Sequence, residues 1–247
     1  KNISYIPSVS DLRLAKKNKT ETLLTSFAGF GNPVLGPKTN KLRGIKFVEF
    51  KDNNISKSYK LNKLPSLPST EKEIRAVANV FPDGNKKVFL RNDANENNLR
   101  NANLSKTNVL LFATHGIVAG EWEFLDEPAL VLTPTQIEGS DDIDGLLTAS
   151  EIRELSLDAD FVVLSACNTA AGDESGEGLS GLASAFIFAG AKSIMASHWS
   201  VESDSTQILI TNFFQNLKKL NGTTGPEALR KSMQQLFETP NYSHPIF

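Results

Sequence analysis

Apolar and polar positions alternate along the chain in a way that predicts strands and helices in turn. Two short apolar runs, at 109–114 and 161–166, are rich in β-branched residues and typical of buried strands. Further strands are predicted at 3–6, 23–30, 88–90, 129–132 and 192–197, and helices at 11–19, 69–81, 96–103, 178–189, 204–219 and 226–237. This alternation predicts an α/β fold in which a mostly parallel sheet lies between helices on both faces.

Side chains of characteristic types mark several of the predicted helix starts. Ser69 is of the type that caps a helix N-terminus, and Thr148 with Glu151 has the spacing of a capping box. Pro226 stands in the first turn of the last predicted helix, where its missing N–H is tolerated. These signals place helix starts near 69, 149 and 226.

The chain divides into an N-terminal stretch and a core. We assign residues 1–64 to strands, a helix and a hairpin insertion at 42–61 that belong to or flank the domain, and residues 65–247 to its core. Within the core, 116–128 and 168–177 predict long loops after the two buried strands. Because the chain begins without methionine and ends abruptly, we expect a piece of a longer protein or a cleaved product.

Composition excludes several classes of protein. The 247 residues are 40% apolar and 22% charged, as in an ordinary globular protein. No stretch approaches the roughly 18 apolar residues of a membrane span, and no signal peptide opens the chain, so no membrane partner is expected. A single cysteine allows no internal disulfide, which favours a reducing, cytoplasmic compartment.

The net charge of −2 conceals two halves of opposite sign. Residues 1–100 hold 19 Lys and Arg against 9 Asp and Glu, whereas residues 101–247 hold 7 against 19, which gives +10 and −12. The acidic half is not expected to contact nucleic acid, because neutralising phosphates needs cations. A basic peptide suits it better. The alternative is that the two halves of one domain neutralise each other.

A histidine and the only cysteine occupy matching positions after the two buried strands. His115 follows the first strand and Cys167 ends the second, so neighbouring parallel strands would bring both to the carboxyl edge of the sheet. Their separation of 52 residues, with the histidine first, is the order and approximate spacing found in caspases. We interpret Cys167 as a nucleophile and His115 as its proton acceptor and donor. The competing interpretations are a buried structural cysteine and a structural histidine.

The surrounding residues suggest how such a dyad would work. The N–H groups of Gly116 and Cys167 are candidates for an oxyanion hole. No acidic third member is evident, and a cysteine depends on one less than a serine does. Three histidines and one cysteine without close spacing make a metal site unlikely, and no phosphate-binding loop motif points to a nucleotide cofactor.

Acidic residues after the dyad strands suggest a preference for basic substrates. Asp173 and Glu177 follow Cys167, and Asp204 follows the strand end that carries Trp199. Carboxylates on these loops would line a pocket for Arg or Lys, with Trp199 beside them. Solvated loop charges and helix N-terminal charges are the alternative for each acidic residue taken singly.

The chain resembles the CHAT domain, of the caspase, gingipain and separase group of cysteine peptidases. The resemblance runs from about residue 65 to 240 and includes the N-terminal segment 3–7. It rests on ordered motifs: Ala-Thr-His-Gly at 113–116, Asp-Gly-Leu-Leu-Thr-Ala-Ser-Glu-Ile at 144–152, Leu-Ser-Ala-Cys-Asn-Thr at 164–169, Gly-Glu-Gly at 176–178 and Ala-Ser-His-Trp-Ser-Val at 196–201. It implies a three-layer α/β/α caspase–haemoglobinase-like fold and a dyad carried by His115 and Cys167.

The resemblance also implies an association with tetratricopeptide repeats or with bacterial signalling and defence proteins. Three departures from the family pattern accompany it. His198 stands where an uncharged residue is expected, the hairpin at 42–61 resembles an insertion, and the strand expected after His244 is missing. None removes the dyad.

We therefore predict a cysteine endopeptidase that cleaves a protein partner after a basic residue and is regulated by a partner. Two alternatives stay open at this point. One is a catalytically silent CHAT scaffold that binds proteins through the same groove, and the other is an acyltransferase or different thioester enzyme.

Overall fold

The computed structural model describes residues 24–35, 61, 63–135, 144–165, 177–196, 203–219, 224–240 and 242. The elements predicted at 3–6 and 11–19, and the hairpin at 42–61 apart from Leu61, lie outside these residues. The strands are β1 (Phe27–Gly31), β2 (Lys86–Leu90), β3 (Val109–Ala113), β4 (Gly116–Ile117), β5 (Ala129–Val131), β6 (Leu146–Thr148), β7 (Phe161–Leu164) and β8 (Ile194–Ala196). The α-helices are α3 (Pro68–Ala78), α4 (Glu96–Asn101), α5 (Ala149–Arg153), α6 (Glu177–Ala189), α7 (Ser203–Lys219) and α8 (Gly225–Phe237), with 3₁₀ turns at Arg91–Asp93 and Leu104–Lys106.

Within the ranges that the structure describes, a five-stranded sheet forms the centre of the molecule. Its strand order is β2-β1-β3-β7-β8, and every neighbouring pair is parallel. β1, from the first 64 residues, lies between β2 and β3, so that stretch contributes a strand to the main sheet. The prediction of an α/β fold built on a mostly parallel sheet is confirmed.

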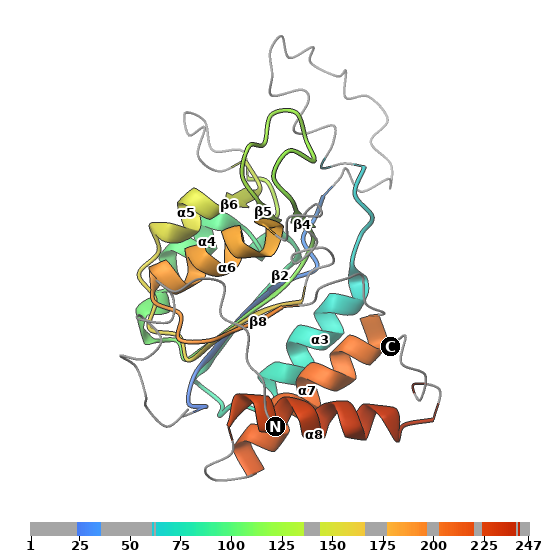
Figure 1. The fold of residues 1–247 in the computed structure, drawn as a ribbon. Helices are drawn as coiled ribbons and strands as arrows, with labels where there is room; N and C mark the ends of the chain where they lie inside the picture. The colour runs from blue at the N-terminus through green and yellow to red at the C-terminus, as the bar shows by residue number, and fades with distance from the viewer. Residues whose placement is uncertain are drawn as a thin grey trace.

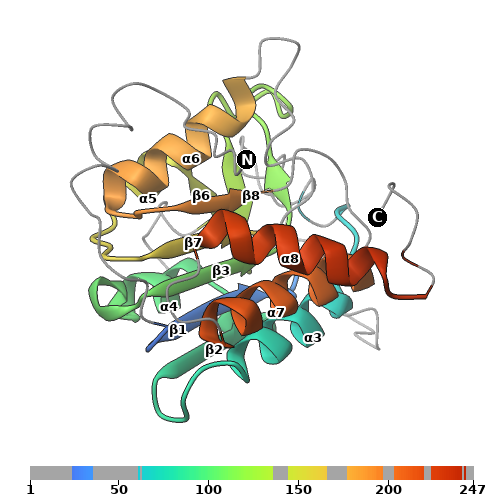
Figure 2. The ribbon, with the colours of Figure 1, turned by 60° about the horizontal axis from the view of Figure 1, so that its bottom comes forward.

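Helices cover both faces of the sheet, which gives three layers (Figures 1 and 2). α4, α5 and α6 lie over one face, and α3, α7 and α8 lie over the other. Because successive strand residues point to opposite faces, each strand contributes to two cores. One core holds Phe30, Phe112, Leu164, Phe186 and Ile152, and the other holds Phe27, Leu111, Val163, Ile74 and Phe214.

A second, smaller sheet was missed by the sequence prediction. β4, β5 and β6 form an antiparallel sheet beyond the carboxyl end of β3 (Figure 1), and β4 occupies the start of the stretch predicted as a loop over 116–128. Strands of two or three residues are too short to show an alternating pattern. The small sheet has its own core, in which Trp122 and Leu125 are buried with Ile117.

Two glycines of β1 allow α3 to approach the sheet closely. A Cβ atom on Gly29 would lie 2.9 Å from Cγ2 of Ile74, and one on Gly31 would lie 2.9 Å from Cγ1 of the same side chain. Any larger residue at either position would push α3 away from β1. Gly29 and Gly31 thus have a packing role.

The helix-start signals are confirmed at two places and wrong at one. Thr148 and Glu151 form the predicted capping box, and Pro226 lies in the first turn of α8. Ser69 is not the cap of α3, because the helix starts one residue earlier, at Pro68, after Leu67. Proline favours that first position, since its fixed φ suits the helix and its N–H is not needed there.

Candidate functional site

The carboxyl edge of the sheet is set by the register between β3 and β7. These strands pair Val109 with Phe161 and Phe112 with Leu164, a constant offset of 52 residues. The N–H of Ser165 donates to the carbonyl of Phe112 over 2.8 Å, which extends the pairing one residue beyond β7. Residues that follow the two strands therefore emerge at one edge of the sheet.

His115 follows β3 by two residues and is half-buried at this edge. Its Nε2 lies 2.8 Å from the carbonyl oxygen of Pro65, in the segment that leads into α3. A carbonyl can only accept a hydrogen bond, so Nε2 carries the proton and the neutral ring has its lone pair on Nδ1. The contact selects the tautomer in which Nδ1 can accept a proton from a neighbouring thiol.

Backbone pairing fixes His115 from its other side. The carbonyl of His115 accepts from the N–H of Val131 over 2.9 Å, and the hydroxyl of Thr114 donates to the carbonyl of Val131. Gly116 lies opposite Leu130 in the β4–β5 ladder. Hydrogen-bonded and non-hydrogen-bonded pairs alternate along an antiparallel ladder. Because Val131 and His115 form a hydrogen-bonded pair, the next pair, Gly116 and Leu130, is not hydrogen-bonded. The N–H of Gly116 is therefore directed away from β5.

The other predicted site residues are only partly covered by the structure. Cys167, Asp173 and Trp199 lie outside the described residues. Glu177 is the first residue of α6, and Asp204 is exposed in the first turn of α7. These two helices cover opposite faces of the sheet (Figures 1 and 2), and each begins at the carboxyl edge because it follows a parallel strand.

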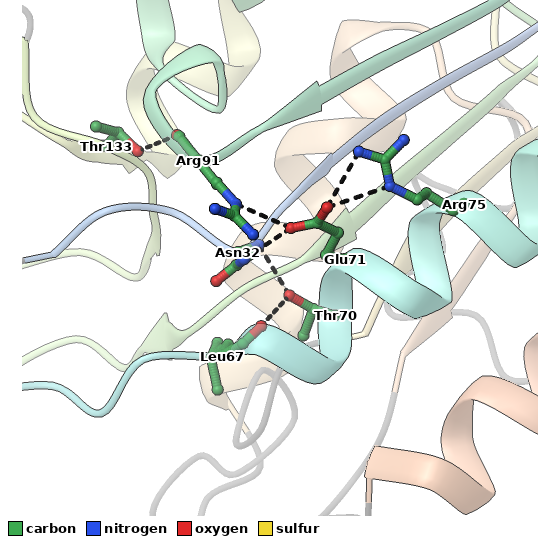
Figure 3. Close-up of polar contacts among 7 residues, drawn as sticks. All are labelled: Asn32, Leu67, Thr70, Glu71, Arg75, Arg91 and Thr133. Atoms are coloured by element: carbon green, nitrogen blue, oxygen red, sulfur yellow. Dashed lines mark hydrogen bonds and ion pairs between the residues drawn. The ribbon is translucent and has the colours of Figure 1, made fainter.

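A carboxylate in the first turn of α3 links this helix to the ends of β1 and β2. Figure 3 shows Glu71 between three donors, with Arg75 on Oε1 at 3.0 Å and Arg91 and Asn32 on Oε2 at 3.0 and 3.1 Å. Asn32 and Arg91 have left-handed φ values of 48° and 56°, which turn the chain sharply after each strand. The hydrogen bond from Arg91, supported by Arg75 and Asn32, holds the pKa of Glu71 below its usual range.

Threonine hydroxyls complete this attachment (Figure 3). The Thr70 hydroxyl accepts from the N–H of Asn32 over 2.8 Å and donates to the carbonyl of Leu67 over 2.7 Å. The Thr133 hydroxyl donates to the carbonyl of Arg91 over 2.6 Å. The start of α3, three residues after Pro65, is thus held against the strand ends.

A second carboxyl of α3 is buried beside β7. Glu73 is 3% exposed, and the hydroxyl of Ser165 donates to it. Burial raises the pKa of the Glu73 carboxyl to about 7, and the hydrogen bond from Ser165 opposes part of that rise. Within the described part of the chain, its Oε1 has no hydrogen-bond partner.

Sequence reasoning missed both the Pro65 carbonyl and the burial of Glu73. A backbone carbonyl carries no signal in the sequence, because every residue has one. Glu73 did offer a signal, since it lies four residues before Val77 and next to Ile74 on the apolar side of the predicted helix. An acidic residue at such a position marks a buried polar group that needs a partner.

A second buried carboxyl supports the segment that carries the Asp-Gly-Leu-Leu-Thr motif. Glu96, the first residue of α4, is fully buried and accepts from the N–H of Gly145 over 2.8 Å. Burial, and secondarily the charge of Glu151, raises the pKa of Glu96 to about 8. Arg100 joins the two carboxylates, at 2.8 Å from Glu151 and 4.0 Å from Glu96.

As pH rises, the free energy of unfolding is expected to fall less for the Glu96→Gln variant than for the wild type. A carboxyl with a pKa of about 8 in the folded state and 4.5 when unfolded stabilises the fold below pH 4.5, and this contribution is lost as pH rises towards 8. Glu73 acts in the same direction. Each carboxyl changes the free energy of unfolding by about 1.4 kcal/mol per pH unit within its range.

Urea unfolding of wild type and Glu96→Gln between pH 5 and 8.5 measures this dependence. The wild-type free energy of unfolding should fall with pH, and more steeply than that of the variant. The exposed Glu123→Gln is the matched control and should follow the wild type. Equal slopes for Glu96→Gln and wild type would contradict the assignment of a neutral carboxyl at Glu96.

No other class of site is visible in the described ranges. Among these residues, no group of three or more His, Cys, Asp or Glu side chains is placed to hold a metal ion. In the same part of the chain, no helix combines the length and apolar character that crossing a membrane requires.

Comparison with known proteins identifies the family to which this chain belongs. The family model described as CHAT domain matches residues 1–247, the entire chain. Tetratricopeptide repeat protein 28 of Mus musculus is 32% identical over 100 residues, and its Homo sapiens counterpart is 31% identical over 100 residues. Each alignment covers 40% of this chain but only 4% of the curated relative.

Proposed function

Because the chain belongs to the CHAT domain family, which is a family of caspase-like cysteine peptidases, we propose that it is a cysteine endopeptidase with His115 and Cys167 as its dyad. One observation carries the proposal. The offset between β3 and β7 is 52 residues, and His115 and Cys167 are separated by the same 52 residues. If this register continued past the strand ends, residue 167 would lie at the same edge of the sheet as residue 115.

The tautomer of His115 suits it to this role. With the proton on Nε2, held by the Pro65 carbonyl, Nδ1 accepts the proton of the Cys167 thiol. The thiolate attacks the carbonyl carbon of the scissile peptide bond, and the carbonyl oxygen takes the negative charge. Nδ1 returns the proton to the leaving amine, which leaves a thioester that water hydrolyses.

Three backbone groups stabilise charge in this mechanism. The Gly116 N–H, directed away from β5, and the N–H of Cys167 donate to the oxyanion. The Pro65 carbonyl faces the Nε2–H of the imidazolium that forms when His115 takes the proton. A carbonyl dipole thus contacts the ring nitrogen that does not serve the nucleophile, which is the role of the acidic third residue in serine enzymes.

A preference for a basic residue before the scissile bond follows from charge. Residues 101–247 carry a net charge of −12, and Asp173, Glu177 and Asp204 belong to segments that follow β7 and β8. We assign these carboxylates to recognition of Arg or Lys, with Trp199 beside them, because a cationic side chain gains charge-assisted hydrogen bonds there.

The biological setting of the chain is part of the same proposal. Both curated relatives are named as tetratricopeptide repeat proteins, which supports a repeat segment as the regulatory partner of this chain. We place the chain in a regulated bacterial signalling or defence protein of the cytoplasm, on the family resemblance and the single cysteine.

A peptide library with single Arg, Lys or neutral residues before the cleavage point tests the proposal. The wild type should cleave after Arg or Lys, and Cys167→Ala should show no cleavage above background. Full cleavage by Cys167→Ala would overturn the proposal. Lack of cleavage by the wild type, together with an iodoacetamide reaction no faster than that of a free thiol, would favour a protein-binding scaffold without catalysis.

A further inference from the structure

Glu73 is a carboxyl whose position is unfavourable for stability alone. It lies on α3 beside Ile74 and Val77, which are fully buried in the core between α3 and the sheet. Burial of a carboxyl with one oxygen lacking a partner is costly compared with an apolar side chain of the same shape. A side chain kept there at such a cost points to a role at the adjacent strand end.

Ser165, the partner of Glu73, is the first residue after β7. Its N–H donates to the carbonyl of Phe112 on β3, and its hydroxyl donates to Glu73 on α3. The end of β7 is therefore held from two directions, by the sheet through the backbone and by α3 through the side chain. Cys167 follows two residues later in the sequence.

The segment just before the same helix contacts His115. The Pro65 carbonyl, which accepts from Nε2 of His115, belongs to the segment just before α3. α3 cannot shift easily, because Ile74 packs against the glycines of β1 and Glu71 binds Arg91 at the end of β2. The helix α3 and the segment just before it thus contact both the histidine side of the site and the strand that leads to the cysteine.

We propose that Glu73 and Ser165 form a positioning pair that, through α3, holds the chain leading to Cys167 in line with His115. Neither residue touches the substrate in this proposal, and both act through the strand end. The inference rests on the proposed dyad and adds residues that set its alignment. A misplacement of about 1 Å at a reacting group can lower a rate by about a hundredfold, so alignment is a sufficient reason to keep a buried carboxyl.

The single cysteine allows a test that needs no substrate. Iodoacetamide labelling, followed by mass spectrometry of the intact chain, reports on Cys167 alone because no other cysteine is present. We expect Ser165→Ala to slow labelling at pH 7 by about tenfold, within the range of couplings between contacting residues. Ser165→Thr keeps the hydroxyl and should restore the rate to within about threefold of wild type.

Two further variants separate positioning from stability. The double variant Glu73→Met with Ser165→Ala replaces the polar pair by apolar groups, which should leave the fold at least as stable as wild type. Its labelling should still be slowed, because the connection between α3 and β7 is lost. Glu96→Gln is the matched control, since it neutralises another buried carboxyl that contacts Gly145 instead of β7, and its labelling rate should equal that of wild type.

Repeating the measurement in a His115→Ala background identifies the origin of the effect. If the pair acts by aligning the cysteine with His115, Ser165→Ala should have no further effect once His115 is gone. Equal labelling of Ser165→Ala and wild type, or an unchanged Ser165→Ala effect without His115, overturns the positioning role. If His115→Ala alone leaves the labelling rate unchanged, His115 does not activate Cys167 and the proposed dyad is wrong. That result differs from both results that overturn the positioning role alone.

Discussion

Replacing His115 with alanine is expected to slow peptide cleavage by about 10²–10⁴-fold, the usual contribution of a positioned acid–base group. His115 is half-buried at the carboxyl edge, and its Nε2 donates to the Pro65 carbonyl. That bond leaves Nδ1 as the acceptor for the thiol proton and later as its donor to the leaving amine. Alanine removes both transfers.

Cleavage of the best basic-residue peptide from the library, measured as kcat/KM at pH 7, provides the test. His244→Ala makes the same chemical change at a histidine outside the proposed site, so it should retain wild-type kcat/KM. A His115→Ala rate within about threefold of wild type would show that the histidine is not the proton carrier, since that loss is far below the range for general acid–base groups.

Replacing Phe112 with alanine is expected to lower the free energy of unfolding by about 3–5 kcal/mol, as for other buried phenylalanines. Phe112 is fully buried in the central strand, with ring centroids 5.3 Å from Phe30 and 5.5 Å from Phe186. Removal of the ring leaves a cavity between the sheet and α6 that packed neighbours can only partly fill.

Urea unfolding at one pH measures this effect, and Phe188 offers the matched control. Its side chain is 71% exposed on α6, so Phe188→Ala should change the free energy of unfolding by no more than about 0.5 kcal/mol. A Phe112→Ala loss below about 1 kcal/mol would mean that the core between β3 and α6 is not packed as described.

The strands and helices could be predicted where the pattern was long or chemically distinctive. The apolar runs that became β3 and β7 were predicted because they are buried on both faces, which leaves no polar residue in them. The capping box of Thr148 was predicted because a hydroxyl and a carboxylate three residues apart satisfy two helix N–H groups. By contrast, β4 and β6 form from residues without a periodic pattern, and pairing with β5 decides their state.

Some residues of the candidate site could likewise be predicted from the sequence, and others could not. His115 and Gly116 were identified because a strand-end residue of reactive type is visible in the sequence alone. The Pro65 carbonyl was not, since the contact depends on how the segment before α3 passes the end of β3. Glu73 was seen only as a helix residue, because its burial depends on the close approach that Gly29 and Gly31 allow.

The sequence by itself determined the α/β class, the family and the residue types available for chemistry, because these depend on local pattern and composition. Tertiary structure alone decided the 52-residue register of β3 against β7, the Nε2 tautomer of His115 and the attachment of Ser165 to Glu73. Each of these depends on contacts between segments far apart in the chain. No single segment encodes them.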